Sequence, residues 1–247
     1  MTADAGRSPF PVRFAVWVPR PPVDLEISVA ADGTCDVEIL TDTTLPQTAP
    51  PRLGRFRATI EAPAAAALAE IAIGATAAGR APGGPADSGA QLVAVFGGPL
   101  VPAPDIGFDQ VRVLMEAAAA ALTRPIAAIE VAASQGASGI ELVIRSIGTE
   151  AVPIVLFEGG NPDMWARLWR DDPSDPEGRR YVDRDILVRM VEAGRLADGT
   201  ISLGPSDEVR LPLPGAGART GGFAFWRAGA GPERRALVGS WTLSPSA

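Results

Sequence analysis

The feature that constrains the fold most is a series of short segments after residue 125 in which apolar and polar residues alternate. "IAAIEVAAS", "GIELVIRSIG" and "VPIVLF" follow one another, and "GTISLG", "EVRLPLP", "GFAFWRAG" and "RALVGSWTL" continue the series. In the second segment Ile140, Leu142 and Ile144 would face one way, with Glu141 on the other side. Such alternation, divided by glycine and serine turns, predicts an all-β antiparallel sandwich over residues 125–247.

The first half of the chain mixes strand and helix patterns. "VDLEISVAADGTCDVEIL" predicts a β-hairpin around Asp32 and Gly33 with one buried face. "GRFRATI" and the apolar "QLVAVFG" predict two more strands, the second of them central in its sheet.

Two alanine-rich segments predict helices. In "EAPAAAALAEIAIGATAAG" Pro63 suits the first turn, and Leu68 and Ile71 fall on one face, together with Ala75. In "DQVRVLMEAAAAALT" Asp109 stands close to the expected N-cap. The order of elements predicts a small α+β domain over residues 1–124, with both helices covering one face of a sheet.

Two stretches of the second half resemble a known superfold. "GIELVIRSIGTEAVPIVL" has the form of a strand, a polar turn and a partner strand, and "DGTISLGPSDEVRLPLP" that of a turn leading into a closing strand. On these stretches the second half resembles the immunoglobulin-like β-sandwiches common in bacterial proteins. The Cys-Trp-Cys core of antibody domains is missing, so the resemblance implies a fold and no function.

Two residue types are missing from the chain, and their absence excludes several chemistries. There is no histidine, and all 22 basic residues are arginine. Without histidine there is no Ser-His-Asp triad or HExxH zinc site, and without lysine no Walker phosphate grip or Schiff base. Catalysis would have to use carboxylates, hydroxyls, Tyr181, Cys35, arginine or a cofactor. We expect no cofactor and, more generally, no enzyme.

Charge and hydropathy indicate the expected partners and compartment. The net charge is −7 and the arginines are scattered, so we expect no nucleic-acid partner. Near the start only residues 14–18 form an apolar run, too short for a signal peptide or a membrane span. We therefore expect a soluble, cytoplasmic protein. The single Cys35, in the alternating "TCDVEIL", is expected to be a buried structural thiol rather than a nucleophile.

A charged excursion over residues 158–197 interrupts the predicted strands. Residues 161–185, "NPDMWARLWRDDPSDPEGRRYVDRD", hold seven carboxylates, five arginines and two tryptophans. The spacing does not fit a calcium loop, because proline occupies ligand positions. A glycosidase would need two converging carboxyl groups, one with a raised pKa. The weak catalytic candidates are Glu158, Asp163, Asp171 and Asp172, but the arginines among them would favour the charged carboxylate.

The tryptophans of this excursion are the binding candidates, together with the adjacent arginines: Trp165, Trp169, Arg167 and Arg170. Residues 161–170 fit a helix or a strand almost equally well. On a strand, Ala166 and Leu168 would face inward. At least one tryptophan is expected to anchor the core, and the acidic part is expected to be a solvated loop. "VDRDILVRMVEAGRLA" predicts a short helix after it.

The glycine-rich "GAGARTGG" at residues 215–222 imitates a phosphate-binding loop. The third glycine of GxGxxG is replaced by Thr220, and the flanking strands are expected to be antiparallel. We therefore expect a hairpin loop there.

These observations favour a binding or scaffolding protein, an accessory subunit or adaptor that contacts another protein through edge strands and loops of the sandwich. The alternative is a carboxylate-dependent hydrolase or a carbohydrate-binding module centred on residues 158–185. The two differ in geometry, because the alternative requires carboxylates that converge in a concave site beside an exposed indole.

Overall fold

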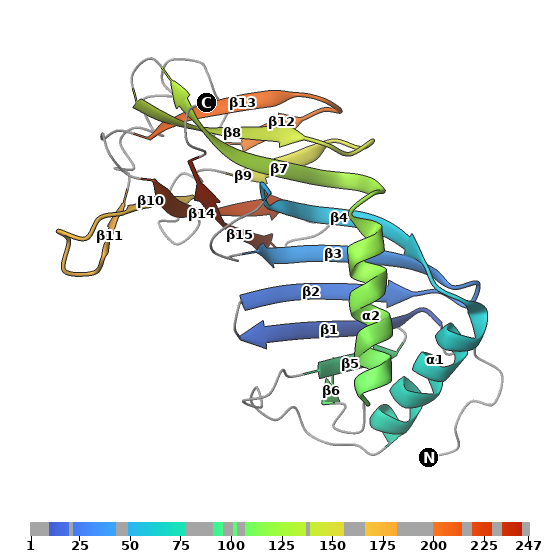
Figure 1. The fold of residues 1–247 in the computed structure, drawn as a ribbon. Helices are drawn as coiled ribbons and strands as arrows, with labels where there is room; N and C mark the ends of the chain where they lie inside the picture. Colours follow the sequence, from blue (N-terminus) through green and yellow to red (C-terminus); the bar gives the residue numbers. More distant parts are fainter. Residues whose placement is uncertain are drawn as a thin grey trace. The chain divides into compact units, whose positions relative to one another are not determined.

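The protein is mostly β, with two α-helices among the residues that its computed structural model describes (Figure 1). The described residues are 10–19, 22–42, 49–77, 91–95, 101–102, 107–136, 139–155, 166–181, 200–213, 219–228 and 234–243. Contacts within the chain divide it into two compact units: Met1–Glu38 with Arg55–Arg124, and Ile39–Gly54 with Pro125–Ala247. Neither described helix has the length and apolarity needed to span a lipid bilayer.

The first unit contains four complete strands and both described helices: β1 (Val12–Pro19), β2 (Pro22–Val29), α1 (Ala62–Ala77), β5 (Gln91–Val95), β6 (Val101–Pro102) and α2 (Phe108–Ala121). Two further strands pass from one unit into the other: β3 (Thr34–Asp42) and β4 (Arg52–Thr59). The predicted hairpin is confirmed as β2 and β3, whose turn is closed by the Ala30 N–H, which donates to Thr34 O at 2.8 Å. Leu25 and Ile27 are buried on the face that alternation predicted.

The helices begin where the sequence predicted, with differences in detail. Pro63 lies in the first turn of α1 and Leu68 is buried, but Ile71 is only half-buried. The buried stripe of α1 is made mainly of alanines, because this helix packs closely beside β5. Asp109 is close to the N-cap of α2, as expected, but it is not itself the cap. The N-cap of α2 is Gly107, without a side-chain cap, and Asp109 lies in the first turn.

The second unit contains nine further strands: β7 (Pro125–Gly136), β8 (Gly139–Ser146), β9 (Val152–Val155), β10 (Arg167–Asp171), β11 (Arg179–Tyr181), β12 (Thr200–Leu203), β13 (Glu208–Leu213), β14 (Thr220–Ala228) and β15 (Arg234–Thr242). Each of the seven alternating segments after residue 125 contains one of these strands. In β8, Ile140, Leu142 and Ile144 are buried, while Arg145 on the opposite face is exposed. The alternation therefore identified seven of the nine strands and, in β8, the face of Ile140, Leu142 and Ile144, although Val143 on the other face is buried as well.

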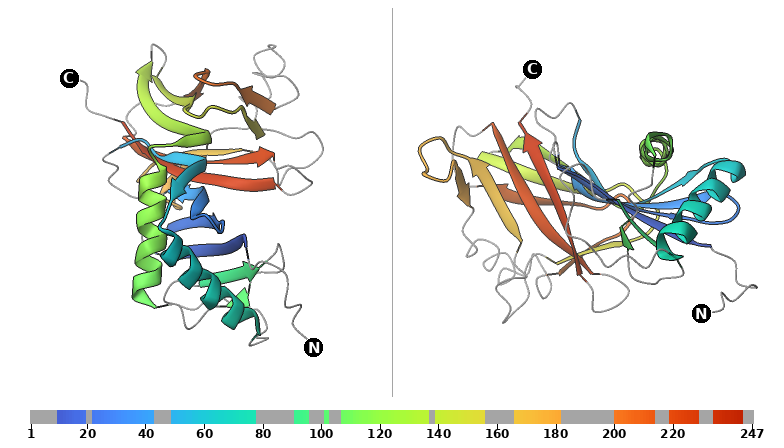
Figure 2. Two further views of the ribbon diagram at one scale, coloured as in Figure 1. Left: turned by 90° about the vertical axis from the view of Figure 1, so that its right-hand side faces the viewer. Right: turned by 90° about the horizontal axis from the view of Figure 1, so that it is seen from below.

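Pairing joins these strands into a curled, mixed sheet. The path runs β13–β8–β7–β4–β3–β15–β14–β9–β12, and β15 pairs with β3 in parallel, with Val238 opposite Thr41. The first and last strands of this path, β13 and β12, are consecutive in the sequence. Residues 204–207 join them in a turn in which the Gly204 N–H donates to the Asp207 carboxylate at 2.8 Å. A short turn therefore joins the two ends of this path, although β12 and β13 do not pair with each other, and Figure 2 shows the curl of the sheet.

The core of the second unit pairs aromatic rings with glycines. Phe223 lies directly opposite Gly239, and Trp241 directly opposite Gly221, on the neighbouring strands β14 and β15. A Cβ atom on Gly239 would collide with the Phe223 ring, and one on Gly221 with the Trp241 ring. Each glycine therefore provides the space that a buried ring occupies.

The glycine-rich segment 215–222 is not the hairpin loop that we expected. Thr220, Gly221 and Gly222 belong to β14. Among the described residues β13 pairs with β8, whereas β14 pairs with β15, β10 and β9, so the segment joins strands that are not partners. The helix expected after residue 182 lies outside the described residues.

Candidate functional site

The described part of the charged excursion is a hairpin, β10–β11, at the end of the sheet. Figure 1 shows it extending beyond β14, with which β10 pairs antiparallel. Of residues 161–170, for which the sequence left a helix and a strand open, 161–165 lie outside the described residues, whereas 167–170 lie in the strand β10. The reason is the core: Leu168 is 2% exposed and lies opposite Phe223. Ala166 is also buried, as the strand alternative predicted.

The acidic residues between the strands build the turn. The Asp172 Oδ1 atom accepts hydrogen bonds from the Ser174 N–H at 3.0 Å and the Ser174 hydroxyl at 2.6 Å. The Asp175 Oδ1 atom accepts from the Glu177 N–H at 3.0 Å. Aspartates that accept from the backbone two residues later are typical of tight turns. The carboxylates of the turn thus hold its backbone in place; the turn is exposed at residues 173–174 and 176–178, whereas Asp172 and Asp175 are half-buried.

Trp169 lies at the centre of the hairpin's outward face. It is directly opposite Gly222 of β14, and a Cβ atom on Gly222 would collide with its indole ring. On the other side Tyr181 of β11 faces it, with ring centroids 6.2 Å apart. The Arg179 guanidinium lies over the indole at 5.6 Å from the ring centroid, a cation–π contact. The indole is therefore held between a glycine and an arginine.

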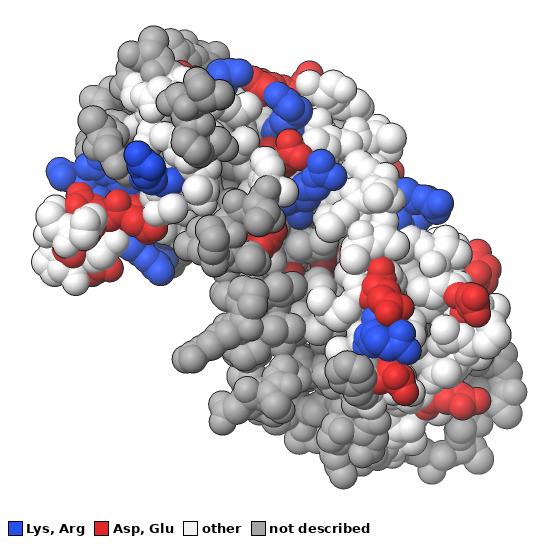
Figure 3. Space-filling model, viewed as in Figure 1, with Lys and Arg blue, Asp and Glu red and all other residues white. Residues whose placement is uncertain are grey.

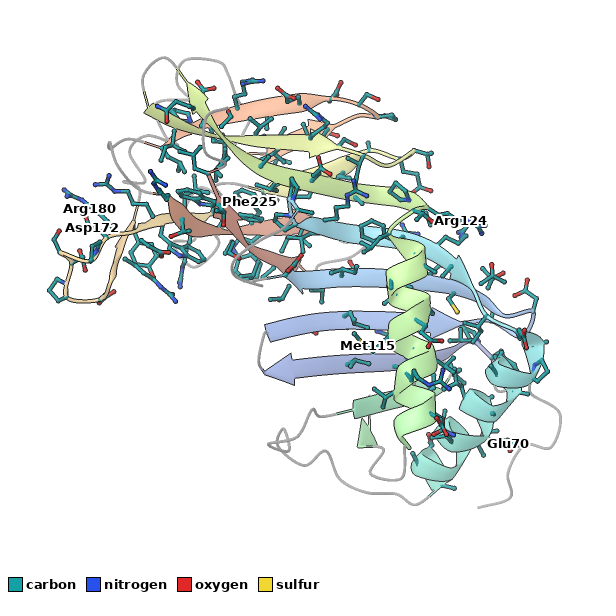
Figure 4. The ribbon with its side chains drawn as sticks, in the orientation of Figure 1. Glu70, Met115, Arg124, Asp172, Arg180 and Phe225 are labelled. Carbon is teal, nitrogen blue, oxygen red and sulfur yellow. The ribbon has the colours of Figure 1, made fainter. Side chains whose placement is uncertain are left out.

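Residues 166–181 hold four arginines and four acids, and two of the arginines lie on the face opposite Trp169. Arg170 and Arg180 are direct cross-strand partners. Asp172 lies near both, with its Oδ2 atom 3.8 Å from the nearest Arg170 nitrogen. Hydrogen bonds from Ser174 hold the pKa of Asp172 below its usual value, and the charges of Arg170 and Arg180 lower it further. Figure 3 shows basic and acidic side chains intermixed on this hairpin, and Figure 4 labels Arg180 and Asp172.

The catalytic candidates do not form an acid pair in the described part of the chain. Asp171 accepts a hydrogen bond from the Thr220 hydroxyl at 2.6 Å, and Asp172 is engaged by Ser174. A general acid needs a raised pKa, whereas that of Asp172 is lowered. Glu158 and Asp163 lie outside the described residues, as does Trp165. Within the described residues no group of three metal-ligating side chains occurs.

Cys35 has the properties of a structural thiol. Its side chain is fully buried, and burial raises the pKa of the thiol to about 11. A reactive cysteine needs an accessible thiolate in an electropositive setting. The prediction of a buried, unreactive Cys35 agrees with both observations.

The structure brings together five of the candidate site residues, Arg167, Trp169, Arg170, Asp171 and Asp172, and adds Tyr181, Arg179 and Gly222, none of which the sequence analysis named as a binding candidate. Tyr181 and Arg179 belong to the site because β11 pairs with β10, and Gly222 because β14 does. The signal for β11 is weak. It consists of an aspartate- and proline-rich turn between two arginine-containing segments, a composition that equally suits a loop.

Comparison with known proteins assigns nothing to this site: the chain matches no family model, no curated protein and no solved structure.

Proposed function

We propose that the protein is a non-enzymatic binding module, an adaptor or accessory subunit, that contacts another protein through the outward face and free edge of β10–β11. The observation that carries this proposal is Tyr181. It is 49% exposed on an edge strand, and Trp169 and Arg179 lie directly beside it. Tyrosine, tryptophan and arginine are the residues that dominate binding energy in protein interfaces.

The backbone of β11 supports the proposal. Among the described strands β11 pairs with β10 alone. The Asp172 N–H donates to Gly178 O at 3.1 Å, and hydrogen-bonded pairs alternate along an antiparallel ladder. Arg170 and Arg180 then form the next hydrogen-bonded pair, and the backbone groups of Arg179 and Tyr181 point to the free edge. An extended segment of a partner could add there as a further strand.

The contacts of Trp169 favour protein binding over carbohydrate binding. A sugar stacks on an indole whose ring face is open to solvent. Here Gly222 underlies the ring and Arg179 lies over it. A carbohydrate-binding module or hydrolase centred on residues 158–185 stays the alternative. It would need Glu158, Asp163 or Trp165 to supply what the described residues do not.

We also infer that the second unit has an immunoglobulin-like arrangement, with β7, β8 and β13 in one layer and β9, β12, β14 and β15 in the other. Support comes from the order of the strands, because the chain passes between these two sets after β8, after β12 and after β13. For the first unit we infer a small α+β domain with both helices on one face. The free edge of β11 is needed for the proposed function whichever arrangement holds.

The experiment is affinity capture from lysate of the native cells, with the full chain immobilised beside two variants. Tyr181→Ala removes the exposed ring of the hairpin. Ile73→Ala is the matched control, since Ile73 is exposed to a similar extent, 47%, on α1. We expect one protein recovered in stoichiometric amount with the unaltered chain and with Ile73→Ala, and lost with Tyr181→Ala. A partner that is indifferent to Tyr181→Ala, or saturable binding to a glycan array, would overturn the proposal.

A further inference from the structure

Two arginines of the β10–β11 hairpin face each other on adjacent strands. Arg170 and Arg180 are direct cross-strand partners, so their side chains leave the sheet on the same face. Like charges directly opposite each other destabilise a strand pair. An anion bound on that face would therefore stabilise the hairpin.

Asp172 supplies only part of that anion. Its Oδ1 atom is committed to the turn by two hydrogen bonds from Ser174. Its Oδ2 atom is 3.8 Å from Arg170, which is too long for a hydrogen bond. Arg180 forms no ion pair with any described residue, and neither does Arg167, which is exposed on the opposite face of β10. Among the described residues, Arg180 and Arg167 thus place guanidinium groups without an ion-pair partner on opposite faces of the hairpin.

We propose that the partner segment is an acidic extended strand that pairs with the free edge of β11 and places a carboxylate against Arg180 and Arg170. This inference rests on the proposed function and specifies its partner. In an added strand the residue opposite Arg180 shares its face, and the next residue shares the face of Tyr181. The chemistry that fits is an alternating segment, in which carboxylates meet the arginines and small or apolar side chains meet the Tyr181 ring.

Two other occupants of the edge fit less well. A second copy of the same edge, aligned antiparallel about Arg180, would bring two Arg180 side chains together and repeat the like-charge problem. A nucleic acid could contact the arginines and aromatic rings of the hairpin, but its phosphates would be repelled by a protein of net charge −7. Isolated carboxylates on a peptide match two neighbouring guanidinium groups among acidic residues better than a continuous row of phosphates does.

The test uses the full chain and short blocked peptides, which are defined probes. The main probe alternates glutamate with threonine, and the controls alternate glutamine or lysine with threonine. A single-stranded oligonucleotide serves as a further probe. We expect salt-sensitive binding of the glutamate peptide alone, measured by calorimetry, and slower hydrogen exchange of the Arg179 and Tyr181 amides in the complex.

Charge reversal assigns the binding to the hairpin. Arg180→Glu should weaken binding of the glutamate peptide at least about tenfold, because it replaces attraction by repulsion. Arg57→Glu is the matched control: Arg57 is an exposed strand arginine that pairs with Asp36 and belongs to the other unit. We expect Arg57→Glu to bind like the unaltered chain, and circular dichroism verifies that both variants are folded.

Three results would overturn the inference: no binding of the glutamate peptide, binding unchanged by Arg180→Glu, or preference for the oligonucleotide. None of these results tests the proposed function. That test is the affinity capture, in which Tyr181→Ala is expected to lose the captured protein. If that loss occurs and the glutamate peptide does not bind, the hairpin is an interface and its partner is not an acidic strand.

Discussion

At the scale of single residues, the second unit depends on glycines placed opposite aromatic rings. Trp169 opposite Gly222, Trp241 opposite Gly221 and Phe223 opposite Gly239 form three such pairs on adjacent strands. Two of the rings lie in the core, and the third, Trp169, is only partly exposed on the outward face. The same device thus fills the interior of the sheet and positions the indole of the candidate site.

The first prediction concerns Gly239 and uses the same substitution elsewhere as its control. Gly239→Ala should destabilise the protein by about 1–3 kcal/mol, because the added methyl group collides with the buried Phe223 ring. Gly74→Ala, inside helix α1 with open space around the position, should stabilise by about 0.5–1 kcal/mol. Urea unfolding followed by circular dichroism measures both. Equal effects of the two variants would show that the ring can move aside.

At the scale of the elements, alternation predicted the strands because burial on one face of a sheet is a local property of the sequence. The choice of partner is not local. Nothing in the sequence indicates that β13 pairs with β8, β12 with β9, or β15 with β3 in parallel. For the same reason the sequence predicted only a part of the candidate site. Trp169 and Arg170 stand out in the sequence, whereas Tyr181 and Gly222 join them only through the register of β10 with its neighbours.

The second prediction concerns the exposed edge of β11. Charged side chains on an edge strand oppose pairing with other chains. Arg180→Val removes that charge and adds a residue that favours strands, so we expect self-association that increases with protein concentration, measured by light scattering after gel filtration. Arg57→Val makes the same exchange on β4, which has strand neighbours on both sides, and should stay at the oligomeric state of the unaltered chain. If both variants self-associate, the replacement of an exposed arginine by valine promotes association on either strand, and the exposed edge of β11 is not the cause.

The third prediction is a pH dependence set by the pair β8 and β13. The Glu208 carboxylate accepts hydrogen bonds from Arg145 at 2.8 Å and contacts Arg210 at 2.7 Å, and these contacts lower its pKa. A carboxylate with a lowered pKa stabilises the fold above its unfolded pKa of 4.5, and this contribution is lost as the pH falls through the folded value. Glu208→Gln should therefore lose less stability between about pH 5 and pH 3 than the unaltered chain.

Thermal unfolding at a series of pH values measures this difference. The effect should be small and should shrink in 1 M salt, because the pair is close to the surface and is screened. An unchanged slope in the variant would mean that Glu208 does not couple stability to pH.

At the scale of the whole molecule, the boundary between the two units does not follow the sequence in a simple way. The sequence predicted one part over residues 1–124 and another over residues 125–247. By contacts, Ile39–Gly54 belongs with the second unit. The change of pattern at residue 125 is visible in the sequence, but the assignment of Ile39–Gly54 depends on long-range pairing. Thr41 lies opposite Val238, and Pro51 O accepts from the Val131 N–H at 3.1 Å.

The last prediction follows from this division. A fragment of residues 125–247 lacks the parallel partner of β15 and the Arg52 guanidinium, which pairs with Glu130 at 3.0 Å. With an edge of β15 and an edge of β7 unpaired, we expect this fragment to be poorly folded and to aggregate, with little dispersion in its amide NMR spectrum.

A second fragment restores the missing strands and serves as the control. Residues 34–57 joined by a short glycine linker to residues 125–247 supply β3 and most of β4. The linker can be short because the Arg57 N–H donates to Arg124 O at 3.0 Å in the whole chain. This fragment should give a dispersed spectrum and a cooperative unfolding transition. If residues 125–247 alone unfold just as cooperatively, then Ile39–Gly54 is not an integral part of the second unit, and the boundary at residue 125 is a true domain boundary.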